Sequence, residues 1–111
     1  VDLAYAYSGV DGTAIEAFVK SGARAIVGVG LGSGSAPRVF LQALEAARER
    51  GVTVVVASQS FNGRVMARRA FVSRGFAVAD NLPAKKARIV LMLALAAPRS
   101  PDDIQRMMLT Y

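Results

Sequence analysis

Two short, almost uninterrupted apolar runs, residues 25–29 (AIVGV) and 52–56 (VTVVV), constrain the fold of this chain more than any other feature. Both contain β-branched residues and neither alternates with polar ones, as is typical of strands that are buried on both faces. Between them, residues 36–50 place apolar side chains such as Phe40 and Leu44 at helical spacing. Strand, helix and strand in this order predict a parallel sheet with a right-handed crossover.

The rest of the chain continues the alternation. Residues 3–7 alternate large and small side chains and predict a first strand, and residues 76–78 predict a fourth. Asp11 can cap a helix after the first strand, and Gly22 is placed to end that helix. Asn62-Gly63 predicts a turn.

For two segments the sequence allows more than one interpretation. Residues 64–73 are compatible with a short helix or an irregular loop. A helix expected from Pro83 onward is apolar nearly all round at residues 89–95, so it belongs in an interior or an interface. A last helix is predicted to start at the sequence Ser-Pro-Asp-Asp, residues 100–103, with Ile104, Met107 and Met108 as core residues.

These elements predict one α/β domain over residues 1–111: a three-layer sandwich with a parallel sheet of about four strands, Rossmann-like or flavodoxin-like. The strands at 25–29 and 52–56 should be central. Ala25, Ile26 and Val54 should therefore be nearly inaccessible to water.

Composition excludes several kinds of site. The chain has no cysteine and no histidine, which excludes disulfides, the usual zinc sites and a histidine general base. The longest apolar run, residues 89–97, is too short to cross a bilayer. We therefore expect no metal, no cofactor and no membrane contact. The chain begins at Val1 without an initiator methionine, and we interpret it as a segment of a longer protein.

The net charge is +6, and Arg64, Arg68, Arg69 and Arg74 form a basic run without an acid. Such a run can be a solvated face, a subunit contact or a nucleic-acid site. No RNA-binding or helix-turn-helix pattern surrounds it, so we favour the first two and expect no nucleic-acid partner.

A glycine-rich loop, VGVGLGSGSAP at residues 27–37, follows the second expected strand and lies where open α/β sheets bind ligands. The dinucleotide fingerprint G-x-G-x-x-G fails in each register, and no acid follows the next strand to hold a ribose. The glycines alone are compatible with a tight turn. They do not explain Ser33 and Ser35, two small hydroxyls on a loop that a small ligand can approach closely.

Five segments in order carry a resemblance over essentially the whole chain: VDLAYAYSGVDGTAI, GARAIVGVGLGSGSAP, FNGRVMARR, GFAVADNLPAKKARIVLMLAL and PDDIQRMMLTY. Together they resemble the carboxyl-terminal domain of bacterial L-asparaginases, which hydrolyse asparagine and often glutamine to the acid and ammonia. The G-x-G-[SN]-G-[SN] loop at 30–35 and the L-P-x-x-K-A-R helix start at 82–88 are specific in combination.

The resemblance implies a two-domain subunit whose amino-terminal domain, absent from this chain, carries a threonine nucleophile. It also implies a homo-oligomer, a dimer or tetramer, in which this domain completes the active site of a neighbouring subunit. The loop position that contacts the substrate's α-amino end matches Ser35. A cytoplasmic enzyme is expected, and this fragment alone should be inactive because none of its hydroxyls has a base nearby.

Two departures limit what carries over from the family. Several members place a glutamate after the third strand, whereas residues 64–74 here contain no acid, so we assign no catalytic residue. Many members have arginine at Gln59. A non-catalytic ligand-binding or assembly module therefore stays open as an alternative.

Overall fold

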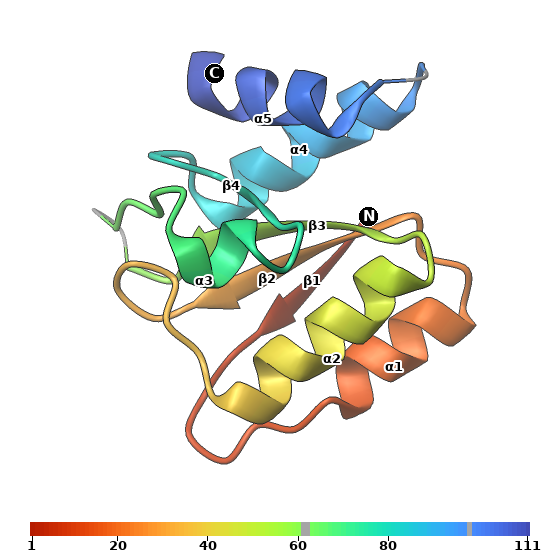
Figure 1. Ribbon diagram of the computed structural model, residues 1–111, viewed down its shortest axis with the longest axis vertical. Helices are drawn as coiled ribbons and strands as arrows, with labels where there is room; N and C mark the ends of the chain where they lie inside the picture. Colours follow the sequence, from red (N-terminus) through yellow and green to blue (C-terminus); the bar gives the residue numbers. More distant parts are fainter. Residues whose placement is uncertain (61–62, 98) are drawn as a thin grey trace.

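The computed structural model describes residues 1–60, 63–97 and 99–111, and it is an α/β fold with one four-stranded sheet (Figure 1). The elements in chain order are β1 (Asp2–Tyr5), α1 (Thr13–Lys20), β2 (Ala25–Gly30), α2 (Arg38–Glu49), β3 (Thr53–Ser58), α3 (Arg69–Val72), β4 (Ala77–Val78), α4 (Ala84–Leu95) and α5 (Pro101–Thr110).

The sheet is parallel, and its strands lie in the order β1-β2-β3-β4. The two apolar runs form its centre, since Val27 of β2 pairs with Leu3 on one side and with Val55 on the other. Ala25 and Ile26 have no exposed surface, and Val54 is 1% exposed. The predicted parallel sandwich with two buried central strands is therefore confirmed.

The strand order places all three crossover helices on one face of the sheet, because crossovers of one hand between sequential neighbours fall on the same side. The side chains that pack α1, α2 and α3 against this face include Ile15, Phe40, Leu44 and Phe71. The second face is covered by the chain after β4, where α4 and α5 pack over Val27, Val29, Val55 and Ala57. Figure 1 shows the three layers, with α4 and α5 on one side of the sheet and α1 and α2 on the other.

The structure adjusts the end of the first strand and the cap of the first helix, since the N-cap is Gly12 and Asp11 lies one residue before it. β1 ends at Tyr5 rather than at residue 7, because the chain turns after Ala6 and Val10 donates a backbone hydrogen bond to the Tyr7 carbonyl. Asp11 accepts a hydrogen bond from the Thr13 N–H at 3.0 Å at the beginning of α1. That helix ends before Gly22, as predicted.

Residues 64–73, for which the sequence allowed a short helix or an irregular loop, contain both. Residues 69–72 form the single turn α3, and the residues before it are irregular. The turn is held by Phe71, whose side chain is buried in the core. The predicted turn at Asn62-Gly63 includes residue 62, which lies outside the described residues, and Gly63 donates a backbone hydrogen bond to Ser60.

The edge strand β4 has only two residues, and a side chain covers its outer side. The Gln105 amide of α5 accepts a hydrogen bond from the Val78 N–H and donates one to the Val78 carbonyl, both at 2.9 Å. The side-chain amide thus takes the place of a neighbouring strand. An edge strand that is covered in this way does not offer its backbone for pairing.

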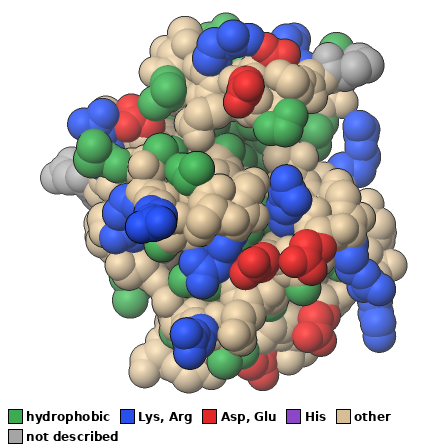
Figure 2. All heavy atoms as spheres, viewed as in Figure 1, with side chains coloured by type: hydrophobic (Ala, Val, Ile, Leu, Met, Phe, Trp, Pro, Cys, Tyr) green, Lys and Arg blue, Asp and Glu red, His purple; other side chains and the backbone are tan. Residues whose placement is uncertain are grey.

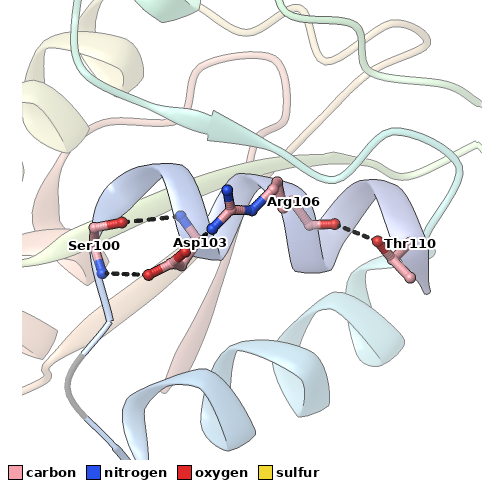
Figure 3. Close-up of polar contacts among 4 residues, drawn as sticks. All are labelled: Ser100, Asp103, Arg106 and Thr110. Carbon is pink, nitrogen blue, oxygen red and sulfur yellow. Dashed lines mark hydrogen bonds and ion pairs between the residues drawn. The ribbon is translucent and has the colours of Figure 1, made fainter.

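The last two helices differ in how they are stabilised. The inner face of α4 is buried, whereas Ile89, Met92 and Leu93 are exposed on its outer face. α5 begins with a capping box, in which the Ser100 hydroxyl accepts from the Asp103 N–H and the Asp103 carboxylate accepts from the Ser100 N–H (Figure 3). No helix in the described ranges is both long and apolar enough to span a bilayer.

Candidate functional site

The glycine-rich loop folds into a small closed turn at the carboxyl end of β2. Leu31 and Ser35 face each other and exchange backbone hydrogen bonds of 2.8 and 2.9 Å, and the Gly34 N–H also donates to the Leu31 carbonyl at 2.7 Å. Residues 32–34 therefore form the tip of the turn between the paired residues Leu31 and Ser35. The loop lies where the sequence predicted it, at the end of the sheet where the strands point.

Gly34 is required because the turn lies directly on the core. Its φ is 96°, which is unfavourable for residues with a side chain, and a Cβ there would lie 3.0 Å from methyl groups of both Val56 and Val65. The loop is therefore seated on β3 and on the segment that follows it. A loop held at this point cannot shift without disturbing the core.

Ser58, the last residue of β3, ties the loop to the sheet. The residue is 7% exposed, and its hydroxyl donates a hydrogen bond to the Gly32 carbonyl and accepts one from the Ser60 N–H at 3.0 Å. Ser58 was not among the residues predicted for the site. A polar residue at the carboxyl end of an apolar run is the signal that could have found it.

Gln59 joins three strand ends. Its backbone N–H donates to the Gly30 carbonyl at 2.7 Å, and its side-chain amide donates to the carbonyls of Ala6 and Val29, the latter at 3.2 Å. An amide at this position therefore binds backbone carbonyls at the ends of β1 and β2 without forming an ion pair. Gln59, which stands where many family members have arginine, therefore has a structural role in this chain.

Ser33 and Ser35 are both exposed on the outside of this fixed turn. Neither hydroxyl has a hydrogen-bond partner among the described residues, and Arg68 approaches the Ser33 carbonyl at 3.4 Å. A hydroxyl without a base can donate to or accept from a ligand, but nothing here activates it as a nucleophile. The site can therefore recognise a small polar molecule rather than attack it.

The turn does not line the roomiest of the four clefts described on the surface. That cleft, of about 580 Å³, lies between the first turn of α5 and the segment around β4, and its floor includes Val52 and Val54 at the amino end of β3. Ser33 and Ser35 lie at the opposite end of the sheet, on an open surface. A ligand there needs walls from another part of the protein or from another chain.

The basic run is tied to its surroundings by several contacts. Arg64 pairs with Asp80 at 2.6 Å, Arg74 lies 3.3 Å from Glu45, and Arg68 stacks over the Phe71 ring at 4.6 Å. Figure 2 shows basic side chains gathered where α3 lies in Figure 1, with acidic side chains next to them over α1 and α2. Three of the four arginines of the run therefore have partners within the chain.

Comparison with known proteins agrees with this geometry. Residues 1–108 match the family model described as the glutaminase/asparaginase C-terminal domain. The chain belongs to this family. The match covers the whole sheet, the glycine-rich turn, α4 and all but the last two residues of α5, so the family resemblance drawn from the sequence is confirmed.

Two curated relatives and one solved structure show how close the likeness is. The chain is 34% identical over 114 residues to a glutaminase-asparaginase of Pseudomonas fluorescens biotype A, covering 100% of this chain and 32% of the relative. It is 34% identical over 105 residues to L-asparaginase 2 of Bacillus subtilis, covering 95% and 28%. The crystal structure of a probable cytoplasmic L-asparaginase from Campylobacter jejuni superposes with a TM-score of 0.92 at 35% identity, over 99% of this chain and 36% of that one.

This asparaginase-family domain thus spans about a third of the length of the curated relatives that it matches. These relatives are named a glutaminase-asparaginase and an L-asparaginase.

Proposed function

We propose that this domain is part of an L-asparagine amidohydrolase, which converts L-asparagine and water to L-aspartate and ammonia, with glutamine as a second candidate substrate. In this proposal an amino-terminal catalytic domain, which is not part of this chain, supplies the nucleophile. The carboxyl-terminal domain completes the active site of a neighbouring subunit in a homo-oligomer, a dimer or a tetramer.

The observation that carries the proposal is the setting of Ser35. Its hydroxyl is exposed and unpartnered among the described residues, on a turn fixed by backbone pairing, by Ser58 and by the core beneath Gly34. An amino-acid substrate has charged ends that need fixed polar partners. A hydroxyl whose backbone is already held loses little further freedom when it binds such an end.

The open surface around Ser35 supports the oligomer. A neighbouring chain can provide the missing walls, and activity would then depend on assembly. We assign Ser35 to substrate binding and no residue of this chain to catalysis or to a metal.

The experiment replaces one loop hydroxyl at a time in the longer protein that carries this domain. Ser35→Ala should remove a hydrogen bond to a charged group and cost about 1.5 to 3 kcal/mol of transition-state binding, measured as a fall in kcat/KM on asparagine. Ser33→Ala is the matched control, since its hydroxyl lies two residues away on the same turn. Light scattering checks that both variants keep the assembly of the parent.

Equal and small effects at the two serines would mean that the loop is only a tight turn, and Ser35 would have to be withdrawn. The purified chain of residues 1–111 serves as a second control. It should release no ammonia from asparagine, because it contains no activated nucleophile.

A cytoplasmic location completes the proposal. It is supported by the likeness to the Campylobacter jejuni protein, whose name says probable cytoplasmic, although a Haemophilus influenzae relative at 34% identity is named a probable periplasmic L-asparaginase. Fractionation of cells that express the longer protein would decide between the two compartments.

A further inference from the structure

Asp80 connects the end of β4 to the segment after β3. It is the one non-glycine residue in the described ranges with a positive φ, 56°. Its backbone exchanges two hydrogen bonds with Val65, at 3.0 and 3.2 Å, and its carboxylate accepts from Arg64 Nε at 2.6 Å. Asp80 therefore holds two consecutive residues of the other segment, one through the backbone and one through the side chain.

The segment that Asp80 holds lies against the glycine-rich turn. Val65 is fully buried, and two of its methyl groups lie 3.0 and 3.2 Å from where a Cβ on Gly34 would be. A Cβ on Gly63 would collide with the Ser58 hydroxyl and would lie 2.7 Å from the Gly32 carbonyl. Residues 63–65 thus contact the turn at two places.

The environment of the ion pair makes it more than a surface contact. The Asp80 side chain is 14% exposed and that of Arg64 is 55% exposed, so the carboxylate is largely removed from water while its cation reaches the surface. Ala79, the residue before Asp80, donates a backbone hydrogen bond to Val56 at 2.9 Å and fixes this corner to the sheet. Removing the cation would leave a carboxylate that is largely buried and unpaired.

We propose that the Asp80–Arg64 ion pair positions the Ser35 turn. The pair holds Val65 against Gly34, and Gly34 is the residue directly before Ser35. Asp80 and Arg64 are then positioning residues that set where the serine hydroxyl meets a substrate in the neighbouring subunit. The effect on substrate rests on the proposed function, whereas the effect on the turn itself does not.

The test uses Asp80→Asn and Arg64→Gln in the longer protein. Asn tolerates a positive φ, so the backbone corner should persist while the charge is lost. Each variant should raise KM for asparagine by about three- to tenfold and leave kcat close to that of the parent. Hydrogen–deuterium exchange of the peptide spanning residues 27–37 should become faster in both.

The double variant should resemble Asp80→Asn, because both lack the pair and neither leaves the Asp80 carboxylate without its cation. Arg106→Gln is the control: it removes a more exposed arginine–aspartate pair, with Asp103 on α5, and should change neither exchange in the turn nor KM. Additive effects of the two changes, or unaltered exchange at residues 27–37 in both single variants, would overturn the inference.

The two proposals can fail separately. One outcome is that exchange in the turn becomes faster in Asp80→Asn and Arg64→Gln while Ser35→Ala leaves kcat/KM unchanged. That result would uphold the positioning role of the ion pair and withdraw Ser35 from substrate binding. A defective Ser35→Ala variant with an unchanged turn in Asp80→Asn would uphold the site and overturn the role of the ion pair.

Discussion

The Ser58 hydroxyl donates a hydrogen bond to the carbonyl oxygen of Gly32, a residue that lies 26 positions earlier in the chain. The same oxygen atom of Ser58 accepts from the Ser60 N–H. One buried side chain thus partners two backbone groups and joins the loop after β2 to the loop after β3.

We expect Ser58→Ala to lower the free energy of unfolding by about 1 to 3 kcal/mol, because it leaves the Gly32 carbonyl and the Ser60 N–H without this partner. Urea denaturation of the longer protein measures the change. Ser8→Ala, at an exposed position, should stay within about 0.5 kcal/mol of the parent. Indistinguishable values for the two variants would show that solvent replaces the Ser58 hydroxyl at no cost.

A second prediction concerns the edge of the sheet. Gln105→Leu keeps most of the side-chain volume but removes both hydrogen bonds to Val78, and it should cost about 2 kcal/mol of unfolding free energy. It should also make the protein more prone to aggregate, since the outer side of β4 becomes available for pairing. Chemical denaturation and light scattering on heating measure the two effects.

Gln42→Leu on α2 adds a similar apolar surface at an exposed position and serves as the comparison. Aggregation that rises equally in the two variants would mean that added hydrophobicity, not the uncovered strand, is responsible. Gln105→Glu should be intermediate, because a carboxylate still accepts from the Val78 N–H but cannot donate to the Val78 carbonyl.

A third prediction concerns the start of α5. Ser100→Ala should lower the free energy of unfolding by about 1 kcal/mol, the usual effect of losing an N-cap side chain. Asp103→Ala should have a similar effect, and the double variant should cost less than the sum, because the two side chains form one reciprocal box. Thermal unfolding of the four proteins completes the cycle, and strictly additive losses would argue against the box.

A fourth prediction concerns pH. The hydrogen bond from the Thr13 N–H holds the pKa of Asp11 below its ordinary value of 3.8. The bond therefore adds stability above that ordinary value, and the contribution is lost as the pH falls through the lower pKa of the folded state. Asp11→Asn should make the loss of stability smaller between about pH 5 and pH 2.

Denaturation of parent and variant across this range measures the difference, and an NMR titration of the Asp11 carboxyl gives the pKa directly. A value at or above 3.8 in the folded protein would refute the prediction.

The elements that the sequence predicted best are those whose pattern is local. The runs around Val27 and Val55 are apolar and rich in β-branched residues, and few structures other than a buried strand fit that composition. The capping residues before Ile104 are sufficient on their own to predict the start of a helix. The predicted bounds of β1 were less accurate. The turn after Ala6 depends on a backbone hydrogen bond from Val10 to Tyr7, which the periodicity of the sequence does not predict.

The parts that sequence reasoning could not supply depend on contacts between distant segments. Phe71 makes α3 a single turn by entering the core, although the arginines around it give no helix signal. The position of the Ser35 turn could be inferred, since loops after parallel strands share one edge of the sheet. Its attachment through Ser58, Gln59 and Asp80 could not, because each contact joins residues from different strand ends.

The order of the strands has a consequence for synthesis on the ribosome. All four strands and the three crossover helices precede α4, so the sheet can be hydrogen-bonded while Val27, Val29, Val55 and Ala57 still face solvent. Synthesis adds about 5 to 20 residues per second and proceeds from the amino-terminal side, which leaves this apolar surface bare for some seconds. During that interval the half-finished domain would expose the kind of apolar surface that promotes aggregation, and a pause in synthesis before residue 84 would lengthen the exposure.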